Sequence, residues 1–142
     1  MQKLTFDSGM QDFRLPGGVL RFNPADPNVY ARFLEAAQEL KNLENTLAGQ
    51  LQKEPSGETV LTAMKDADLR IKAILNRVFG GETDFDRLLC GVNLLAAAEN
   101  GERVITNLLA ALQPILVGGA QRCAKTKADE AVQKAQARRA AQ

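Results

Sequence analysis

The chain has 142 residues, enough for one ordinary domain. Hydrophobic residues make up 45% of it, but aromatic residues make up only 5% and tryptophan is absent, which predicts a Leu, Val, Ile and Ala core built by helix-on-helix packing. Histidine is absent as well. This excludes Ser–His–Asp and Cys–His catalytic sets and histidine-containing zinc sites, since two cysteines cannot supply the remaining ligands. We therefore expect no catalytic residues, no metal site, no cofactor and no enzymatic activity.

Charge is unevenly distributed although the net charge is only +1. Residues 120–142 hold six basic and two acidic residues, a net charge of +4, whereas residues 1–119 hold 12 basic and 15 acidic residues, a net charge of −3. Cys90 and Cys123 lack a CxxC spacing and indicate reduced thiols inside a cell. The N-terminus lacks an apolar signal core, and no apolar run approaches the roughly 18 residues of a membrane span. The sequence thus predicts a soluble cytoplasmic protein that makes no membrane contact.

Three short runs near the N-terminus alternate apolar and polar residues. They are KLTFD (3–7), QDFRL (11–15) and VLRF (19–22), separated by SGM and PGG. This pattern indicates a hairpin or a small meander, which must lie against helices because short strands are unstable alone. Two interpretations of the sheet are open. Either an exposed edge pairs with another copy or a partner, or the sheet only closes the core.

Two amphipathic helices follow the strands. Asp26 and Pro27 form a strong start signal, an N-cap side chain before a proline at the first helical position. Apolar residues then recur at spacings of three and four to about residue 50. The stretch KEPSGE (53–58) breaks this helix, and Ser56 or Thr59 can cap the second helix, which runs from about 58 to 79 and stops at GG (80–81).

The second half of the chain predicts further helices. Asp84 is expected to cap a helix through DFDRLLCGVNLLAAA (84–98), and ENGE (99–102) to break it. A last helix holds Pro114 as a kink, and GG (118–119) is either a hinge or its end. Residues 120–142 have high helix propensity but almost no apolar stripe, which predicts a helical or frayed basic tail.

These elements predict a mainly α protein with a small N-terminal antiparallel β element, an α+β chain in which four to five helices form a bundle. Residues 1–119 are expected to form a single helical domain that includes the hairpin or meander, and residues 120–142 the tail. Leu40, Leu75 and Leu108 lie in the middle of three helical stripes and are expected to be buried.

Three stretches match ligand-binding motifs only in part. GGETDFD (80–86) brings Glu82, Asp84 and Asp86 together but lacks the spacing of a calcium loop, so helix capping and solvation explain these acids. LPGGV (15–19) lacks the rest of a phosphate-binding loop and is typical of a turn between strands. The basic tail has no aromatic residue for base stacking and is interrupted by Asp129 and Glu130, which argues against nucleic-acid binding.

The order of segments resembles that of the tail assembly chaperones of long-tailed, siphovirus-type phages and prophages. The resemblance covers roughly residues 3–125, and its motifs are structural rather than catalytic. It rests on the β start, LRFNPADPNVYARFLEAAQEL (20–40), a second amphipathic helix, VFGGETDFDRLLCG (78–91) and ITNLLAALQPIL (105–116). Within these stretches, a loop from Gly80 to Asp86 precedes a short helix, and Leu112 to Ile115 contain a proline.

The resemblance implies a cytoplasmic protein that binds the tape measure protein while tails assemble and is absent from the finished particle. The major tail protein and a second copy of the chain are further candidate partners. The expected partner-binding residues lie in the densest apolar region: Leu108, Leu109, Leu112, Ile115 and Leu116. Two alternatives stay open, a DNA-binding or packaging accessory protein of a phage and a structural tail subunit.

Overall fold

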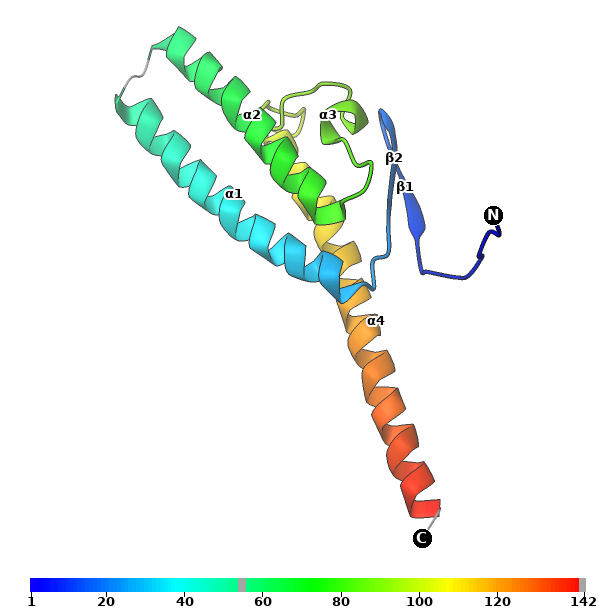
Figure 1. The fold of residues 1–142 in the computed structure, drawn as a ribbon. Coiled ribbons are helices and arrows are strands. Elements are labelled where there is room, and N and C mark those ends of the chain that lie inside the picture. The colour runs from blue at the N-terminus through cyan, green and yellow to red at the C-terminus, as the bar shows by residue number, and fades with distance from the viewer. Residues whose placement is uncertain (54–55, 141–142) are drawn as a thin grey trace.

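The computed structural model describes residues 1–53 and 56–140 (Figure 1). The elements are β1 (Gln11–Leu15), β2 (Gly18–Phe22), α1 (Pro27–Lys53), α2 (Gly57–Phe79), α3 (Phe85–Leu88) and α4 (Val104–Ala140). Helices α1 and α2 lie antiparallel, the first half of α4 lies behind them, and its second half projects away alone. The predicted mainly α protein with a small N-terminal antiparallel sheet is confirmed.

The sheet is a single antiparallel hairpin. Gln11 lies opposite Phe22 and Leu15 opposite Gly18, so the predicted turn lies within PGG, at Pro16 and Gly17. The first alternating run, residues 3–7, is not a strand, and a three-stranded meander does not form. The chain before β1 is instead held beside the end of β2 by Asn23, whose Nδ2 donates a hydrogen bond to the carbonyl oxygen of Ser8 at 3.0 Å.

The predicted boundaries of α1 and α2 are confirmed to within a few residues. Asp26 caps α1 by accepting a hydrogen bond from the amide of Asn28. Ser56 is the N-cap of α2 and accepts from the amide of Thr59, and α2 stops at Gly80, which has a φ of 66°. Pro55, predicted to help end α1, lies outside the described residues.

The helix predicted over 84–98 is wrong in its length. Asp84 does cap a helix, but α3 ends at Leu88, and turns and irregular chain fill most of 89–103. Cys90 and Gly91 have φ values of 55° and 74°, left-handed conformations that cannot continue a right-handed helix. The amide of Leu94 then donates 2.8 Å to the Asp68 carboxylate, a tertiary bond that replaces a helical one.

Helix α4 passes through both of its predicted interruption points. Pro114 lies inside the helix, and Gly118 and Gly119 do not end it. Gly119 is buried, and a Cβ atom there would overlap the backbone carbonyl of Pro24. The glycine therefore serves to bring the loop before α1 close to α4.

The core lies between α1, α2, the sheet and the first half of α4. Leu75 is fully buried as predicted, whereas Leu40 and Leu108 are half-buried and pack against the edge of the core. The prediction that all three are buried is therefore wrong for two. Leu40 lies beside a groove that no other described element fills.

An ion cluster joins α2 to α3, with Lys72 and Asp68 buried and Asp86 exposed. The Lys72 ammonium lies 2.8 Å from the Asp68 carboxylate and 2.7 Å from the Asp86 carboxylate, and Asp68 also accepts from the amide of Leu94. Burial would lower the pKa of Lys72, but its hydrogen bonds to the two aspartates outweigh that effect and raise it. Asp86 thus has a structural partner in Lys72, which the sequence did not predict.

Candidate partner-binding groove

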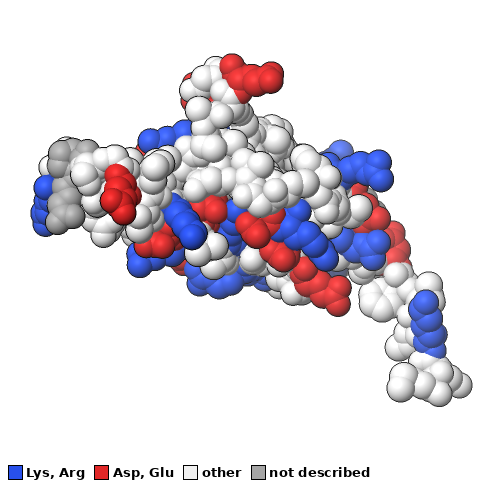
Figure 2. Space-filling model, turned by 90° about the horizontal axis from the view of Figure 1, so that it is seen from above, with Lys and Arg blue, Asp and Glu red and all other residues white. Residues whose placement is uncertain are grey.

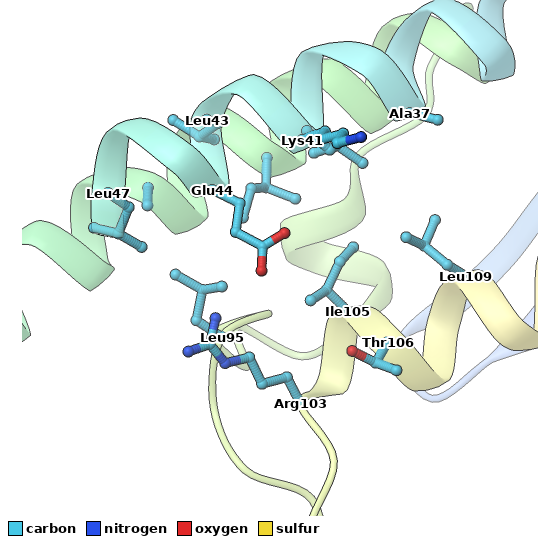
Figure 3. A pocket seen from close by; sticks show the side chains of 13 residues that line it. Ala37, Lys41, Leu43, Glu44, Leu47, Leu95, Arg103, Ile105, Thr106 and Leu109 are labelled. Atoms are coloured by element: carbon cyan, nitrogen blue, oxygen red, sulfur yellow. The ribbon is translucent and has the colours of Figure 1, made fainter. Parts of the chain in front are cut away.

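A groove of about 240 Å³ runs between α1 and the start of α4, and we call it the α1–α4 groove (Figure 3). Apolar side chains of α1 form one wall, and the first turns of α4 form the opposite wall. Ala67 and Ile71 of α2 are buried at its base. The complete lining is Ala37, Leu40, Lys41, Leu43, Glu44, Leu47, Ala67, Ile71, Leu95, Arg103, Ile105, Thr106 and Leu109.

The local sequence explains why this wall of α1 is apolar yet open. Residues at 40, 43 and 47 recur at helical spacing, so their leucine side chains share one face of α1. Leu47 is buried, whereas Leu40 and Leu43 are half-buried and line the groove. The groove therefore exposes part of a helical stripe that would otherwise belong to the core.

Charged side chains stand around this apolar surface. Lys41 and Glu44 come from α1, and Arg103 comes from the residue before α4. In Figure 3 the Glu44 carboxylate reaches from α1 toward the side of the groove that holds Ile105 and Leu95. The groove can bind the apolar face of a partner, and its charged side chains of both signs can orient that partner.

The structure separates the five residues that the sequence predicts as partner-binding. Leu112 and Leu116 are buried in the core of the monomer, and Leu108 and Ile115 are half-buried against it. Leu109 is half-buried and lines the groove. The fold thus brings Leu109 to an open site and places the other four at or inside the core.

Sequence reasoning missed the contribution of α1 to the groove. Leu40 and Leu43 belong to a regular apolar stripe, which is the ordinary signal of a core-facing helix. The charged residues Lys41 and Glu44, which lie within the same stretch and also line the groove, were the available signal that part of this face is open.

The first half of α4 is apolar, and most of its large side chains are half-buried rather than fully buried. Residues 104–121 contain no Asp, Glu, Lys or Arg. Of the described helices, α4 alone is long and apolar enough by length and composition to cross a membrane, and only 17% of its most apolar 18-residue window is buried. The expectation that no apolar run approaches such a length is therefore wrong. Leu112, Leu116 and Gly119 nevertheless join this stretch to the core, and core helices pass the same test.

The second half of α4 carries the basic residues of the tail. It projects beyond the other helices in Figure 1, and its cationic side chains are exposed. These are Arg122, Lys125, Lys127, Lys134, Arg138 and Arg139. On the face of the molecule seen in Figure 2, by contrast, acidic and basic side chains are interspersed rather than gathered into a field of one sign.

Two acids that could hold a metal, Asp84 and Asp86, are engaged in contacts within the protein. Across residues 1–53 and 56–140, no three His, Cys, Asp or Glu side chains gather into a possible metal site. Asp84 accepts the amide hydrogens of Asp86 and Arg87 as a helix cap, and Asp86 pairs with Lys72. Cys90 and Cys123 are both free thiols.

Comparisons with known proteins do not identify the site. No protein-family model, no curated protein and no solved structure matches the chain. The groove geometry and the sequence resemblance are therefore the basis for a functional proposal.

Proposed function

We propose that this protein is a phage or prophage tail assembly chaperone that binds the tape measure protein in the host cytoplasm. The observation that carries the proposal is the α1–α4 groove, which has apolar walls from two helices and charges of both signs around them. Such grooves bind amphipathic helices, whose apolar residues at helical spacing enter the groove. The tape measure protein implied by the resemblance is a long, largely helical chain that needs such cover before the tail tube forms.

The residues take distinct roles in this proposal. Leu109, with Leu40 and Leu43 across the groove, contacts the apolar stripe of the partner helix. Leu112 and Leu116 support that wall from within the core. The protein acts by binding alone, without a catalytic residue, metal or cofactor, and the major tail protein is a further partner.

The uncharged first half of α4 adds a second argument for a protein partner. No charged side chain interrupts residues 104–121, and Ile105 and Leu109 are only half-buried, so part of this apolar stretch stays open to a partner. Since this surface begins in the groove at Ile105 and Leu109, a helix bound there can continue along α4.

Co-expression tests the proposal directly. We expect the tape measure protein encoded beside this chain to be insoluble alone, and to become soluble and co-purify when the two are produced together. Circular dichroism of this protein purified alone provides the folding control. A tape measure protein that stays insoluble beside a folded partner would exclude the chaperone function.

One observation favours a second function, a DNA-binding or packaging accessory protein. Six exposed cations gather on the projecting half of α4. A protein that uses them on duplex DNA should bind at low salt and dissociate steeply as salt rises, because binding releases counterions. A chaperone for a protein partner should show no such DNA binding in the same titration.

A structural tail subunit is the remaining alternative. Mass spectrometry of purified particles separates it from a chaperone. We expect no peptides of this chain at the copy number of a tail component, whereas a structural subunit would be recovered with the major tail protein.

A further inference from the structure

The N-terminal arm, residues 1–8, contacts little of its own chain. It is extended, and it lies away from the helices in Figure 1. Leu4 and Phe6 are 85% and 76% exposed. Alternating exposed apolar residues in an extended segment are the pattern of a strand that has no sheet to join.

The sheet of the same molecule has an open edge. It contains two strands, and β2 is backed by α3, where the amide of Gly17, just before β2, donates 2.8 Å to the carbonyl of Leu88. Among the described elements, only β2 packs extensively on β1. The outer edge of β1 therefore presents backbone donors and acceptors that can pair with another strand.

An aromatic series leads from the core to this edge. The rings of Phe85 and Phe79 are 5.7 Å apart, those of Phe79 and Phe22 are 4.6 Å apart, and those of Phe22 and Phe13 are 4.8 Å apart. Phe85 is fully buried, but Phe13 on β1 is only half-buried. An apolar side chain on a strand added beside β1 could therefore contact Phe13.

The arm is held away from its own open edge. Ser8 and Gly9 lie beside Asn23, the residue that follows β2, which ties the base of the arm to the end of that strand. Gly9 has a φ of 77° and its amide donates to the Asp7 carboxylate, while a Cβ at Gly9 would clash with the Asn23 side chain. This fixed base directs the arm outward rather than back along β1.

We propose that the open edge of β1 takes residues 3–7 of a second copy of this chain as a third, antiparallel strand. The occupant is the chain itself because it carries an unpaired strand pattern of five residues, the same length as β1. Alignment of the apolar faces places Phe6 of the second copy beside Phe13, and Leu4 beside Leu15. The proposal does not depend on the partner assigned to the α1–α4 groove.

This register brings one like-charge pair together on the outer face, and Arg21 reduces its repulsion. Asp7 of the second copy lies opposite Asp12, whose charge is already countered by Arg21 at 2.6 Å. That contact lowers the pKa of Asp12 through its hydrogen bond with Arg21, so its carboxylate stays ionised and paired. Thr5 lies opposite Arg14 and meets no like charge. Reciprocal exchange of two arms closes a symmetric dimer.

A cross-linking experiment distinguishes pairing between copies from pairing within one chain. In a Cys90→Ser, Cys123→Ser background, one chain carries Thr5→Cys and a second carries Arg14→Cys. Because each chain then has a single thiol, a disulfide between the two variants can form only across copies. We expect this heterodimer on mild oxidation. If the mixture gives none while a chain carrying both cysteines closes internally at monomer mass, the proposal is wrong.

Sedimentation of the full chain supplies the second measurement. We expect a dimer that is weakened at least about tenfold by Leu4→Ser with Phe6→Ser, since two large apolar side chains lose their burial. Leu61→Ser with Leu69→Ser is the matched control, because these exposed leucines lie on α2, outside the edge. A monomeric wild type, or a dimer unaffected by the arm variant, would overturn the proposal.

Discussion

The helical body buries its large apolar side chains, whereas the two segments that project from it leave theirs exposed. In the body, Leu75 is fully buried, and even the buried ions Asp68 and Lys72 have partners at hydrogen-bond distance. In the N-terminal arm and the second half of α4, apolar residues such as Phe6 and Val132 are exposed. The body is thus stable through its own contacts, while the projecting segments can gain stability only from another molecule.

The largest loss is expected where a buried charge loses its partner. Lys72→Met leaves the Asp68 carboxylate buried without its cation, which should lower the free energy of unfolding by about 3–5 kcal/mol. Urea denaturation measures this change. The double variant Lys72→Met with Asp68→Asn should recover most of the loss, because asparagine keeps an acceptor for the Leu94 amide. Equal instability of both variants would show that the ion cluster is not the cause.

The same lysine gives a pH dependence with a defined sign. Its pKa in the folded protein is raised above the ordinary value of 10.5, so the folded state holds this proton more tightly than the unfolded state. Its contribution is present below pH 10.5 and is lost as the pH rises through the folded pKa. Alkaline melts should therefore destabilise the wild type more than the Lys72→Met, Asp68→Asn variant.

The loss of stability on truncating a leucine to alanine should increase with the burial of that leucine. Leu75→Ala removes a fully buried side chain and should lower the free energy of unfolding by about 2–5 kcal/mol. Leu40→Ala, at a half-buried position beside the groove, should cost clearly less. Thermal melts of the two variants measure both losses. Equal losses of stability would contradict the placement of Leu40 at the edge of the core.

Adjacent glycines in α4 should respond with opposite signs. Gly119→Ala forces α4 away from the backbone of Pro24 and should cost about 1–3 kcal/mol, in the range of an overpacked core. Gly118→Ala meets only the far end of the Arg122 side chain and should stabilise the helix by up to about 1 kcal/mol. Denaturant midpoints of the two variants test this prediction. If Gly119→Ala did not lower the midpoint, α4 would not lie as close to the Pro24 backbone as described.

The smallest effect is expected at the projecting end of α4. Deletion of residues 126–142 should change the free energy of unfolding by less than about 0.5 kcal/mol, because the described residues of that segment are exposed. Calorimetry of the full chain and of the chain that ends at residue 125 measures the difference. A large drop in melting temperature would mean that this segment packs on another copy.

The sequence predicted the parts of the fold that local signals determine. Asp26–Pro27, Ser56 and Asp84 are capping signals that do not depend on the rest of the chain, and each caps where it was expected. The end of α3 depends on the left-handed backbone at Cys90 and on a bond from Leu94 to a distant aspartate. Neither is visible in the periodicity of the segment.

The candidate site was less predictable than the fold. Apolar stripes show which face of a helix is buried, but not whether another element covers it along its whole length. Leu112 and Leu116 were therefore predicted to bind a partner and lie in the core, whereas Leu40 was predicted to be buried and lines the groove. Whether another element covers an apolar stripe is decided by three-dimensional packing, which the local sequence pattern does not contain.

The central claim, that the α1–α4 groove binds a helix of the tape measure protein, is tested most directly by the soluble yield of that protein on co-expression. Leu109→Lys places a charge in the groove, and Leu69→Lys places the same charge on an exposed leucine of α2 outside it. With both variants folded by circular dichroism, we expect Leu109→Lys to reduce the co-purified yield at least about tenfold and Leu69→Lys to leave it unchanged. Wild-type yield with Leu109→Lys would contradict the claim.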